Sequence, residues 1–349
     1  MDKKVFFKLN GFKIWNGGVN YVNQLKVNLK KEDIDLVIII NDFDYLAINA
    51  LSKNLIDFQK IKTNPFFNKI NLFFLRLGLS FTNLDVNSKD NILIYHGLIP
   101  LSFLSKKFTL IYWLPDILHN IYPSNLSKWN YISRHLFTII NLWFCDKLLL
   151  SSYSVKNELK LFYTFKKNII VYQFSSFAKY IKDPKLEFDK PIVLLPHEFW
   201  THKRQELIVE LANNNKEFLF VLTGNNRISK KNSSYDLFVC ESRKQKYDNI
   251  LNLGIVSWDY LLKLFNHSEY IANISDYEGW NTSVEMAKSL NKKLILSEID
   301  VHKEQTENYS NVVWFSPTLK IPKSKGILFY DYEKEFKIRI KSLCIELYQ

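Results

Sequence analysis

The chain has 349 residues, of which 47% are hydrophobic and 15% aromatic, and it carries a formal net charge of +12. This length and apolar content exclude a disordered protein and predict two domains, since single cores rarely grow beyond about 250–300 residues. Three cysteines without a CxxC pair argue against a disulfide framework or a cysteine zinc site, and they favour a reducing compartment. The positive charge fits nucleic acid, an anionic membrane surface, phosphorylated substrates or a solvated lysine-rich surface without a partner.

No targeting or membrane-spanning segment is predicted. Residues 1–18 lack the apolar stretch of a secretory signal, and the apolar run 136–145 is shorter than the roughly 20 residues that a spanning helix needs. We therefore expect a cytoplasmic protein, with peripheral attachment to the inner face of a membrane as a further location.

The first half of the chain alternates between apolar strand patterns and helical patterns. The segments are a strand at 5–11, a helix at 19–31, strands at 34–42, 91–97 and 108–116, a helix at 128–145, and a strand and helix within 146–159. The apolar runs are typical of strands covered on both faces, which predicts a parallel sheet with helices on both sides.

Residues 177–190 are charged, contain Pro184 and show no clean period, as expected of a linker. A second alternating series follows, so we predict an N-terminal domain at 1–182 and a C-terminal domain at 183–331. The last segment, 332–349, places apolar side chains on one helical face and should dock back on the N-terminal domain; these are Phe336, Ile340, Leu343 and Leu347. We therefore predict an α/β fold class, with two open α/β domains facing across a cleft that binds the ligand.

The chain has only nine glycines, so their positions are informative. Gly17 and Gly18 stand between the first strand and the first helix, where backbone amides can approach an anionic ligand. An ordinary tight turn is the alternative. No GxGxxG or GxxxxGK[ST] pattern occurs, which disfavours nicotinamide dinucleotide binding and P-loop chemistry.

A second group of candidates follows the first strand of the C-terminal domain. The stretch "LLPHEFWTHKRQ" supplies His197, His202, Lys203 and Arg204 beside the next helix. Cations at this place are suited to holding a diphosphate, although a solvated basic helix start has the same composition.

Two loops in the N-terminal half carry weaker signals. "YWLPDILHNIYP" offers Asp116 and His119, and a lone histidine there is usually structural. Asp42 and Asp44 form a D-x-D, in which two carboxylates can hold Mg²⁺ or Mn²⁺ beside a diphosphate, but aspartates are frequent in surface loops. Residues 66–81 mix aromatic and basic side chains, as in a membrane-interface segment or a buried helix.

The stretch "ISDYEGWNTSVEMAKSL" contains two glutamates, and the helix-capping rules account for only one of them. Thr282 and Glu285 fit a capping box, which predicts Thr282 as the N-cap and gives Glu285 a structural role. Glu278 precedes the helix beside Gly279, and no capping rule explains it. Glu278 is therefore the better ligand candidate.

Seven motifs together resemble those of the retaining GT-B glycosyltransferases of family four, over nearly the whole chain. They are, in order, "FKIWNGGVNYVNQL", "YWLPDILHNIYP", "LLPHEFWTHK", "TGNN", "NLGIVSWDYLLKLF", "SDYEGWNTSVEMAKSL" and "LSEIDVHKEQ". The resemblance implies two Rossmann-like domains, a nucleotide-sugar donor (GDP- or UDP-sugar) held mainly by the C-terminal domain, and an acceptor held mainly by the N-terminal one. It implies no metal and no cofactor.

The resemblance also implies residue roles. Lys203 would pair with the donor diphosphate, Glu278 would bind the transferred sugar, and His119 would lie beside the reacting sugar. The remaining donor-binding residues would be Gly17, Gly18, His197, Arg204, Gly224, Val256, Gly279, Trp280, Asn281, Thr282 and Glu285.

Two positions depart from the family pattern. The family's second glutamate falls on Met286, with Glu285 one place early and about 100° around the helix. The family's usual arginine falls on Glu198, so the diphosphate would depend on Lys203 with His197 or Arg204.

The sequence thus predicts a metal-independent retaining glycosyltransferase that acts on a surface polysaccharide or a lipid-linked acceptor. A membrane surface is a further partner, and nucleic acid is not expected. The alternatives are a GT-B sugar-nucleotide epimerase and a non-catalytic subunit that binds a sugar nucleotide.

Overall fold

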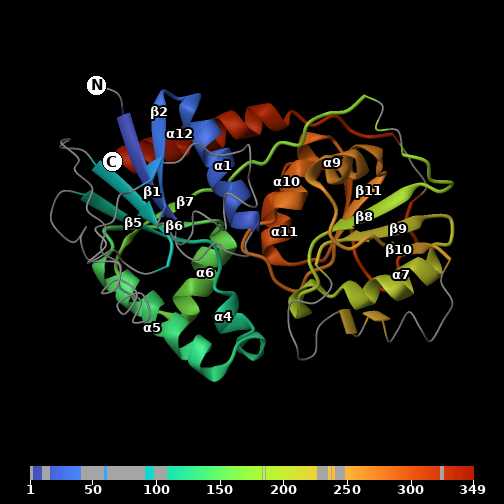
Figure 1. Ribbon diagram of the computed structural model, residues 1–349, viewed down its shortest axis with the longest axis horizontal. Helices are drawn as coiled ribbons and strands as arrows, with labels where there is room; N and C mark the ends of the chain where they lie inside the picture. The colour runs from blue at the N-terminus through green and yellow to red at the C-terminus, as the bar shows by residue number, and fades with distance from the viewer. Residues whose placement is uncertain are drawn as a thin grey trace. The chain divides into compact units, whose positions relative to one another are not determined.

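The computed structural model describes residues 3–9, 16–40, 59–60, 91–97, 108–182, 184, 186–225, 235–236, 238–239, 248–322 and 326–349. The chain divides into two compact units, Met1–Phe174 with Phe336–Gln349 (unit 1) and Ser175–Glu335 (unit 2). Each unit is an α/β unit built on its own parallel sheet (Figure 1). Asp42, Asp44 and segment 66–81 lie outside the described residues.

Unit 1 contains a seven-stranded sheet of order β3-β2-β1-β4-β5-β6-β7, in which all pairings are parallel. The strands are β1 (Lys3–Leu9), β2 (Ile34–Ile40), β3 (Gln59–Lys60), β4 (Asn91–Tyr95), β5 (Phe108–Leu114), β6 (Lys147–Leu150) and β7 (Asn168–Val171). The helices are α1 (Asn16–Lys30), α4 (Leu118–Ile121), α5 (Lys128–Phe144), α6 (Tyr153–Phe162) and α12 (Tyr332–Tyr348), which begins in unit 2.

Aromatic side chains form part of the core of unit 1. The rings of Tyr21, from α1, and Trp113, from β5, stack with centroids 4.3 Å apart, and Phe7 of β1 meets Trp113 edge-on at 5.4 Å. All three side chains are buried. Such pairs add to the free energy that burial of their apolar area supplies.

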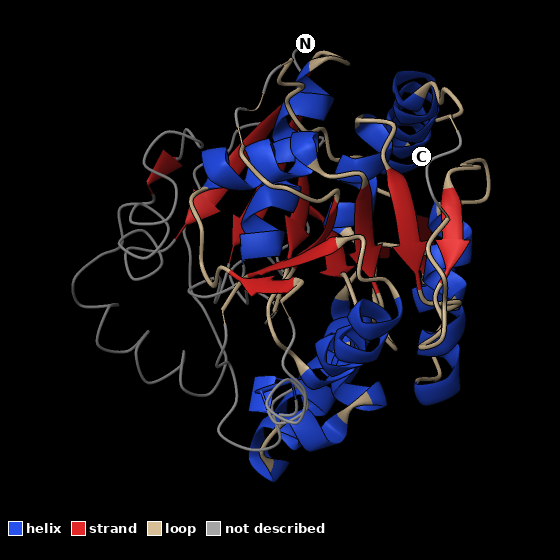
Figure 2. Cartoon of the chain, turned by 90° about the vertical axis from the view of Figure 1, so that its right-hand side faces the viewer, coloured by secondary structure: helices blue, strands red, loops and turns tan. Residues whose placement is uncertain are grey.

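Unit 2 contains six parallel strands in the order β10-β9-β8-β11-β12-β13. The strands are β8 (Ile192–Pro196), β9 (Leu219–Thr223), β10 (Ile250–Asn252), β11 (Tyr270–Asn273), β12 (Lys293–Leu296) and β13 (Val312–Trp314). The helices are α7 (Ile208–Asn214), α9 (Trp258–His267), α10 (Thr282–Ser289) and α11 (Asp300–Gln305), with 3-10 turns η3 (Thr201–Lys203) and η4 (Gln205–Leu207). Figure 2 shows the strands between helices on both sides.

Alternation along the strands builds two cores, one on each face of the unit 2 sheet. Val193 and Leu195 of β8 pack into the cluster that includes α7, whereas Ile192 and Leu194 pack into the cluster that includes α9 and α10. Successive strand residues point to opposite faces, so an uninterrupted apolar strand is the expected pattern for a sheet covered on both sides. The α/β prediction is confirmed.

The C-terminal helix has the predicted apolar face. The four apolar residues of that face, Phe336, Ile340, Leu343 and Leu347, are all buried. Within unit 1, the ammonium of Lys31 lies 4.6 Å from the centre of the Phe336 ring. No helix among those that the structure describes is both long and apolar enough to cross a bilayer.

One sequence prediction about the N-terminal glycines is wrong. Helix α1 begins at Asn16, so Gly17 and Gly18 lie in its first turn and not in the preceding loop. The amides of a first helical turn have no acceptor within the helix, so this position still exposes backbone donors.

Gly224 lies where the carboxyl ends of β8 and β9 in unit 2 approach each other closely. It follows β9 with φ of 112°, and a Cβ built on it would lie 2.7 Å from the carbonyl oxygen of His197, directly after β8. Its amide donates to the carbonyl of Gly254 at 2.7 Å. Only glycine combines this backbone conformation with so close an approach.

Replacing Gly224 with alanine should therefore destabilise the protein by about 2 kcal/mol or more, from a strained backbone and a clash with main-chain atoms. Gly326→Ala is the matched control, because a Cβ there meets nothing within 4 Å. Urea unfolding of both variants tests this, and equal midpoints would contradict it.

Candidate functional site

The strand order of unit 2 has one switch point, between β8 and β11. The chain leaves β8 and runs towards β9 on one side, and it leaves β11 and runs towards β12 on the other. Open α/β sheets bind ligands outside the carboxyl ends of the strands at such a point. The segments that follow β8 and β11, residues 197–204 and 274–281, carry Lys203 and Glu278.

A short irregular segment places Lys203. Lys203 is the last residue of the 3-10 turn η3, and Arg204 after it adopts a left-handed conformation with φ of 52°. The side chain of Gln205 donates to the carbonyl of Glu198 at 2.7 Å, which closes the segment. The amide of Asp276 donates to the carbonyl of His202 at 2.8 Å and joins this segment to the one after β11.

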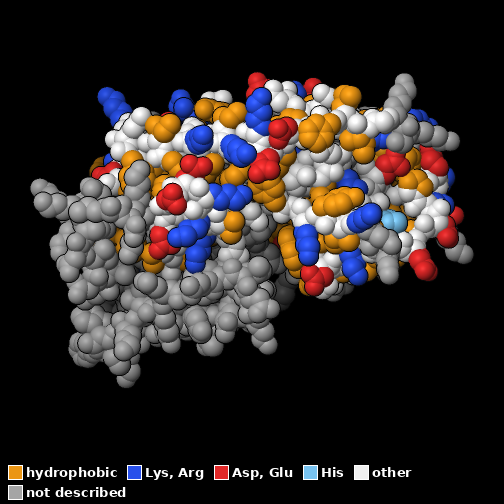
Figure 3. All heavy atoms as spheres, turned by 90° about the horizontal axis from the view of Figure 1, so that it is seen from above, with side chains coloured by type: hydrophobic (Ala, Val, Ile, Leu, Met, Phe, Trp, Pro, Cys, Tyr) orange, Lys and Arg blue, Asp and Glu red, His pale blue; other side chains and the backbone are white. Residues whose placement is uncertain are grey.

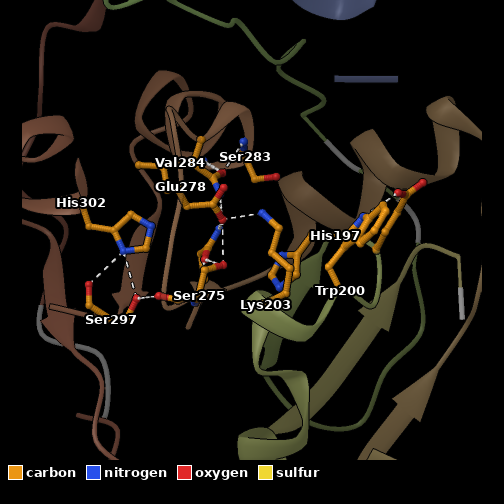
Figure 4. A network of polar contacts seen from close by, with 12 residues as sticks. His197, Trp200, Lys203, Ser275, Glu278, Ser283, Val284, Ser297 and His302 are labelled. Carbon is orange, nitrogen blue, oxygen red and sulfur yellow. Dashed lines mark hydrogen bonds and ion pairs between the residues drawn. The ribbon is translucent and has the colours of Figure 1, made fainter. Parts of the chain in front are cut away.

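The Glu278 carboxylate is buried, with 8% of the residue exposed. Its Oε1 accepts from the Lys203 ammonium and from Ser275 Oγ at 2.7 Å, and it also accepts from two amides, Asn281 Nδ2 at 3.0 Å and Asn273 Nδ2 at 3.1 Å. Burial alone would raise the pKa of Glu278, but the charge and the hydrogen bond of Lys203 outweigh burial and hold the pKa well below its usual range. Glu278 is therefore ionised and paired with Lys203 (Figure 4).

Three neutral histidines surround this ion pair. Burial lowers the pKa of His197 to about 3 and the pKa of His202 and His302 to about 4. These values include a smaller lowering of the pKa by the Lys203 charge and an opposing increase from the Glu278 charge. The pair therefore lies among imidazoles that are uncharged at pH 7.

Two of these rings have buried nitrogens without a hydrogen-bond partner among the described residues. In His197 this holds for both Nδ1 and Nε2, and in His302 for Nε2. His302 Nδ1 lies 2.9 Å from the carbonyl of Ser297, to which it donates, so its Nε2 carries a lone pair. Figure 4 shows His197 beside Lys203 and His302 beyond Glu278. Unpaired buried polar atoms are uncommon, and a bound ligand is one explanation.

The cap of α10 differs from the predicted capping box. Asn281 is the N-cap, and its Oδ1 accepts from the amides of Ser283 at 2.9 Å and Val284 at 3.1 Å. Thr282 is the first helical residue. Asparagine is as good an N-cap as threonine, so the helix begins one residue earlier than the box requires. The same Asn281 side chain also donates to Glu278, which ties the helix start to the ion pair.

Glu285 forms a separate buried network. It is 0% exposed, its Oε1 accepts from Gln305 Nε2 at 3.0 Å, and its Oε2 accepts from the Tyr332 hydroxyl at 2.7 Å. The ammonium of Lys288 lies 3.7 Å from Oε1. The prediction that Glu285 closes a capping box with Thr282 is wrong, because Asn281 is the N-cap and the Glu285 carboxylate contacts Gln305 and Tyr332.

The other site candidates in unit 2 differ in their partners and in their burial. Arg204 pairs with Glu206 at 2.6 Å and Asp276 at 2.7 Å, in contrast to Lys203, which turns to Glu278. Gly279 and the buried Trp280 lie between Glu278 and the N-cap, and the half-buried Val256 follows β10.

The remaining predicted site residues belong to unit 1. Gly17 and Gly18 lie in α1, and His119 lies in α4, where its Nε2 is 3.1 Å from the Tyr163 hydroxyl. Burial lowers the pKa of His119 to about 4, so the ring is neutral at pH 7. Among the described residues, no three histidine, cysteine or acidic side chains group as a metal site.

Sequence reasoning missed three contributors to the site. Asn273 and Ser275 both donate to Glu278, and His302 lies on its far side. Asn273 carried a usable signal, since it is a polar residue that ends a buried strand at the carboxyl edge of a parallel sheet. His302 carried none, because its place depends on a separate helix, α11.

No family model matches the sequence, and no curated protein matches it. Solved structures do match in fold. Sucrose-phosphate synthase from Thermosynechococcus elongatus is 14% identical, with a TM-score of 0.62, and covers 99% of this chain and 91% of its own. Anabaena HepE in complex with UDP-glucose is 12% identical with a TM-score of 0.61, and the match covers 99% of this chain and 91% of HepE. A glycosyltransferase from Rickettsia africae is 16% identical with a TM-score of 0.58, and the match covers 99% of this chain and 89% of that protein. The chain therefore has the GT-B fold of glycosyltransferases.

The buried histidines predict a pH dependence of stability. Unfolded histidines take up protons near pH 6.5, whereas His197, His202 and His302 stay neutral to about pH 4 or below. The three histidines therefore make their full contribution to the free energy of unfolding above pH 6.5. This contribution is lost as the pH falls, by up to about 1.4 kcal/mol per pH unit for each ring. Below about pH 4.5 the lowered pKa of Glu278 adds to the loss.

Urea unfolding between pH 7 and pH 5 measures this slope. His302→Asn should reduce the slope of the unfolding free energy against pH by the contribution of one histidine. An unchanged slope in that variant would show that His302 titrates alike in the folded and unfolded chains.

The Glu285 network gives a separate stability prediction. Glu285→Ala should cost about 3 kcal/mol, because it opens a cavity and removes the buried carboxylate that accepts from Gln305 and Tyr332. It also removes one of the two carboxylates beside the buried Lys288, the other being Glu335 at 3.1 Å. Glu285→Gln should cost less, since glutamine still accepts a hydrogen bond. The control, Glu298→Ala, removes a carboxylate that is 64% exposed and should change stability by less than about 0.5 kcal/mol. Equal thermal midpoints for Glu285→Ala and Glu298→Ala would refute the network.

Proposed function

We propose that the protein is a glycosyltransferase that moves one sugar from a nucleotide-diphosphate-sugar to a glycan or lipid-linked acceptor, with retention of anomeric configuration. The observation that carries this proposal is the buried Lys203–Glu278 pair at the switch point of unit 2. The GT-B fold supports it, as do two neighbours solved with ligands of this class. HepE is in complex with UDP-glucose, and TarM with UDP and α-GlcNAc-glycerol.

In this proposal, Lys203 changes partner when the donor binds. Without a donor, its ammonium is held by Glu278 in surroundings where the neighbouring histidines are neutral. A diphosphate carries more negative charge than one carboxylate, so it competes for the same cation. Glu278 then accepts hydrogen bonds from hydroxyls of the transferred sugar.

His197 is suited to the same ligand. Its two ring nitrogens are buried without partners, and a neutral imidazole offers one donor and one acceptor. The ring thus supplies hydrogen bonds to the donor without adding charge. The proposed diphosphate site consists of Lys203 and His197, with the backbone around Gly224 held close by its glycine.

The chemistry is stabilisation of the leaving group. The bond between the anomeric carbon and the β-phosphate oxygen breaks, and the acceptor oxygen forms a bond to that carbon on the same face. The acceptor hydroxyl gives its proton to the departing diphosphate, so no protein base is required. Negative charge grows on the β-phosphate as the bond breaks, and a fixed cation binds that charge more strongly in the transition state than in the ground state.

Unit 1 would supply the acceptor side. The donor would be a UDP- or GDP-sugar, no metal would be required, and the reaction would take place in the cytoplasm. The described surface in Figure 3 intersperses basic and acidic side chains, which does not favour a nucleic-acid role for that face.

A non-catalytic subunit that binds a sugar nucleotide is the second candidate. The burial of Glu285 and Met286 favours it, because neither side chain is exposed to contact a ribose. Thermal stabilisation by a panel of UDP- and GDP-sugars, followed by assay of nucleoside diphosphate release, separates the two. Donor binding without release supports the subunit, and release of an altered free monosaccharide indicates an epimerase.

Lys203→Ala should lower donor turnover by about 100-fold or more, as expected for loss of a group that stabilises charge in the transition state. It should also lower stability, because the Glu278 carboxylate is left buried without its cation. Lys303→Ala is the matched control, since Lys303 forms a surface pair with Glu298 at 3.3 Å and should leave turnover unchanged.

A double variant separates folding from catalysis. Lys203→Met with Glu278→Gln removes both charges and should recover much of the lost stability while turnover stays low. Full turnover in this variant would remove both residues from the reaction.

A further inference from the structure

Helix α5 exposes an apolar face. Five large apolar side chains of this helix are exposed: Trp129 (81%), Leu136 (51%), Ile140 (40%), Trp143 (74%) and Phe144 (52%). At about 100° per residue, these positions fall within about 100° of the helix circumference. A surface helix normally turns such a stripe towards the core.

The opposite face of α5 is partly polar and is the one that packs inward. Thr138 and Asn141 lie there, and both are buried. Asn141 Nδ2 donates to the carbonyl of Gly97 at 2.6 Å, and Thr138 Oγ1 donates to the carbonyl of Arg134 at 3.0 Å. Because Asn141 Nδ2 and Thr138 Oγ1 both have acceptors on this side, the hydrogen bonds favour this orientation of α5 in unit 1.

The end of α6 extends the apolar surface. Leu161 is 80% exposed and Phe162 is 41% exposed. Two contacts hold this region against α5: the hydroxyl of Tyr163 lies 2.9 Å from His135 Nδ1, and Lys167 Nζ donates to the carbonyl of Trp143 at 3.1 Å. Figure 1 shows α5 and α6 together in unit 1. We call these seven side chains, five from α5 and two from α6, the α5–α6 surface.

The chain segment that carries this surface is predominantly basic. Residues 128–167 contain seven basic side chains and two acidic ones; the basic ones are Lys128, Arg134, Lys147, Lys156, Lys160, Lys166 and Lys167. Both acids have hydrogen bonds within unit 1: Asp146 accepts from the amide of Leu110 at 2.8 Å, and Glu158 accepts from Ser154 Oγ at 3.4 Å. The apolar surface therefore belongs to a segment with a net positive charge.

We propose that the α5–α6 surface binds an anionic lipid bilayer. Tryptophans favour the interface between headgroups and acyl chains, and lysines beside them reach the lipid phosphates. Charge also argues against a second copy of this chain as the occupant, because two copies of the surface would bring their basic residues together. A bilayer instead satisfies both the apolar side chains and the cations.

This inference does not depend on the proposed glycosyltransferase activity, because none of its residues belongs to the Lys203–Glu278 site. Its test needs neither donor nor acceptor. Failure of vesicle binding would leave the donor experiments unaffected, and failure of donor binding would leave this proposal standing.

The experiment is vesicle co-sedimentation of the full chain. With vesicles of phosphatidylcholine and phosphatidylglycerol, the protein should bind, and raising the salt concentration should weaken binding through screening. Trp129→Ser with Trp143→Ser should weaken binding at least tenfold, with thermal midpoint and near-ultraviolet circular dichroism unchanged. The matched control is Trp258→Ser, which removes a 47% exposed tryptophan of unit 2 and should bind like wild type.

Three results would overturn the proposal. The first is equal binding by the double tryptophan variant and wild type. The second is equal binding to anionic vesicles and to pure phosphatidylcholine at every salt concentration. The third is no vesicle binding together with self-association that the double tryptophan variant abolishes, which would identify a second copy as the occupant.

Discussion

The ion pair between Lys203 and Glu278 is the interaction on which the site of unit 2 depends. A carboxylate this buried is stable only with a cation and several donors, and Glu278 has Lys203, two amides and a hydroxyl. These donors come from the end of β11, the loop after it and the N-cap of α10, so the pair fixes the loop and the helix start together. In the proposed reaction, the same contacts keep Lys203 in place for a ligand with greater negative charge.

The strand order explains why the pair forms where it does. Parallel strands β8 and β11 are neighbours, and the chain leaves them in opposite directions. The segments after these strands therefore meet at one edge of the sheet, although Lys203 and Glu278 are 75 residues apart in sequence. Gly224 allows the turn after β9 to approach His197, and a side chain there would push this edge apart.

The sequence predicted much of this arrangement from local patterns. Apolar runs located the strands, helical spacing located the buried face of α12, and the absence of a capping role singled out Glu278. The errors share one physical cause, which is that local rules admitted several solutions. Asn281 and Thr282 are both good N-caps, and only tertiary contacts select Asn281. The partner of Glu285, Tyr332, lies 47 residues away, and no periodicity indicates it. The exposed face of α5 has a helical pattern that looks the same whether it faces a core or a bilayer.

The central claim is that Lys203 exchanges Glu278 for the phosphates of a donor. Nuclear magnetic resonance of the Lys203 ammonium and the Glu278 carboxyl carbon tests it directly, during titration with the nucleoside diphosphate that most stabilises the protein. We predict that both signals change to saturation together and that the matching nucleoside without phosphates has no effect. Signals that stay unchanged at saturating nucleoside diphosphate would contradict the account, because Lys203 would then remain with Glu278 while the ligand binds elsewhere.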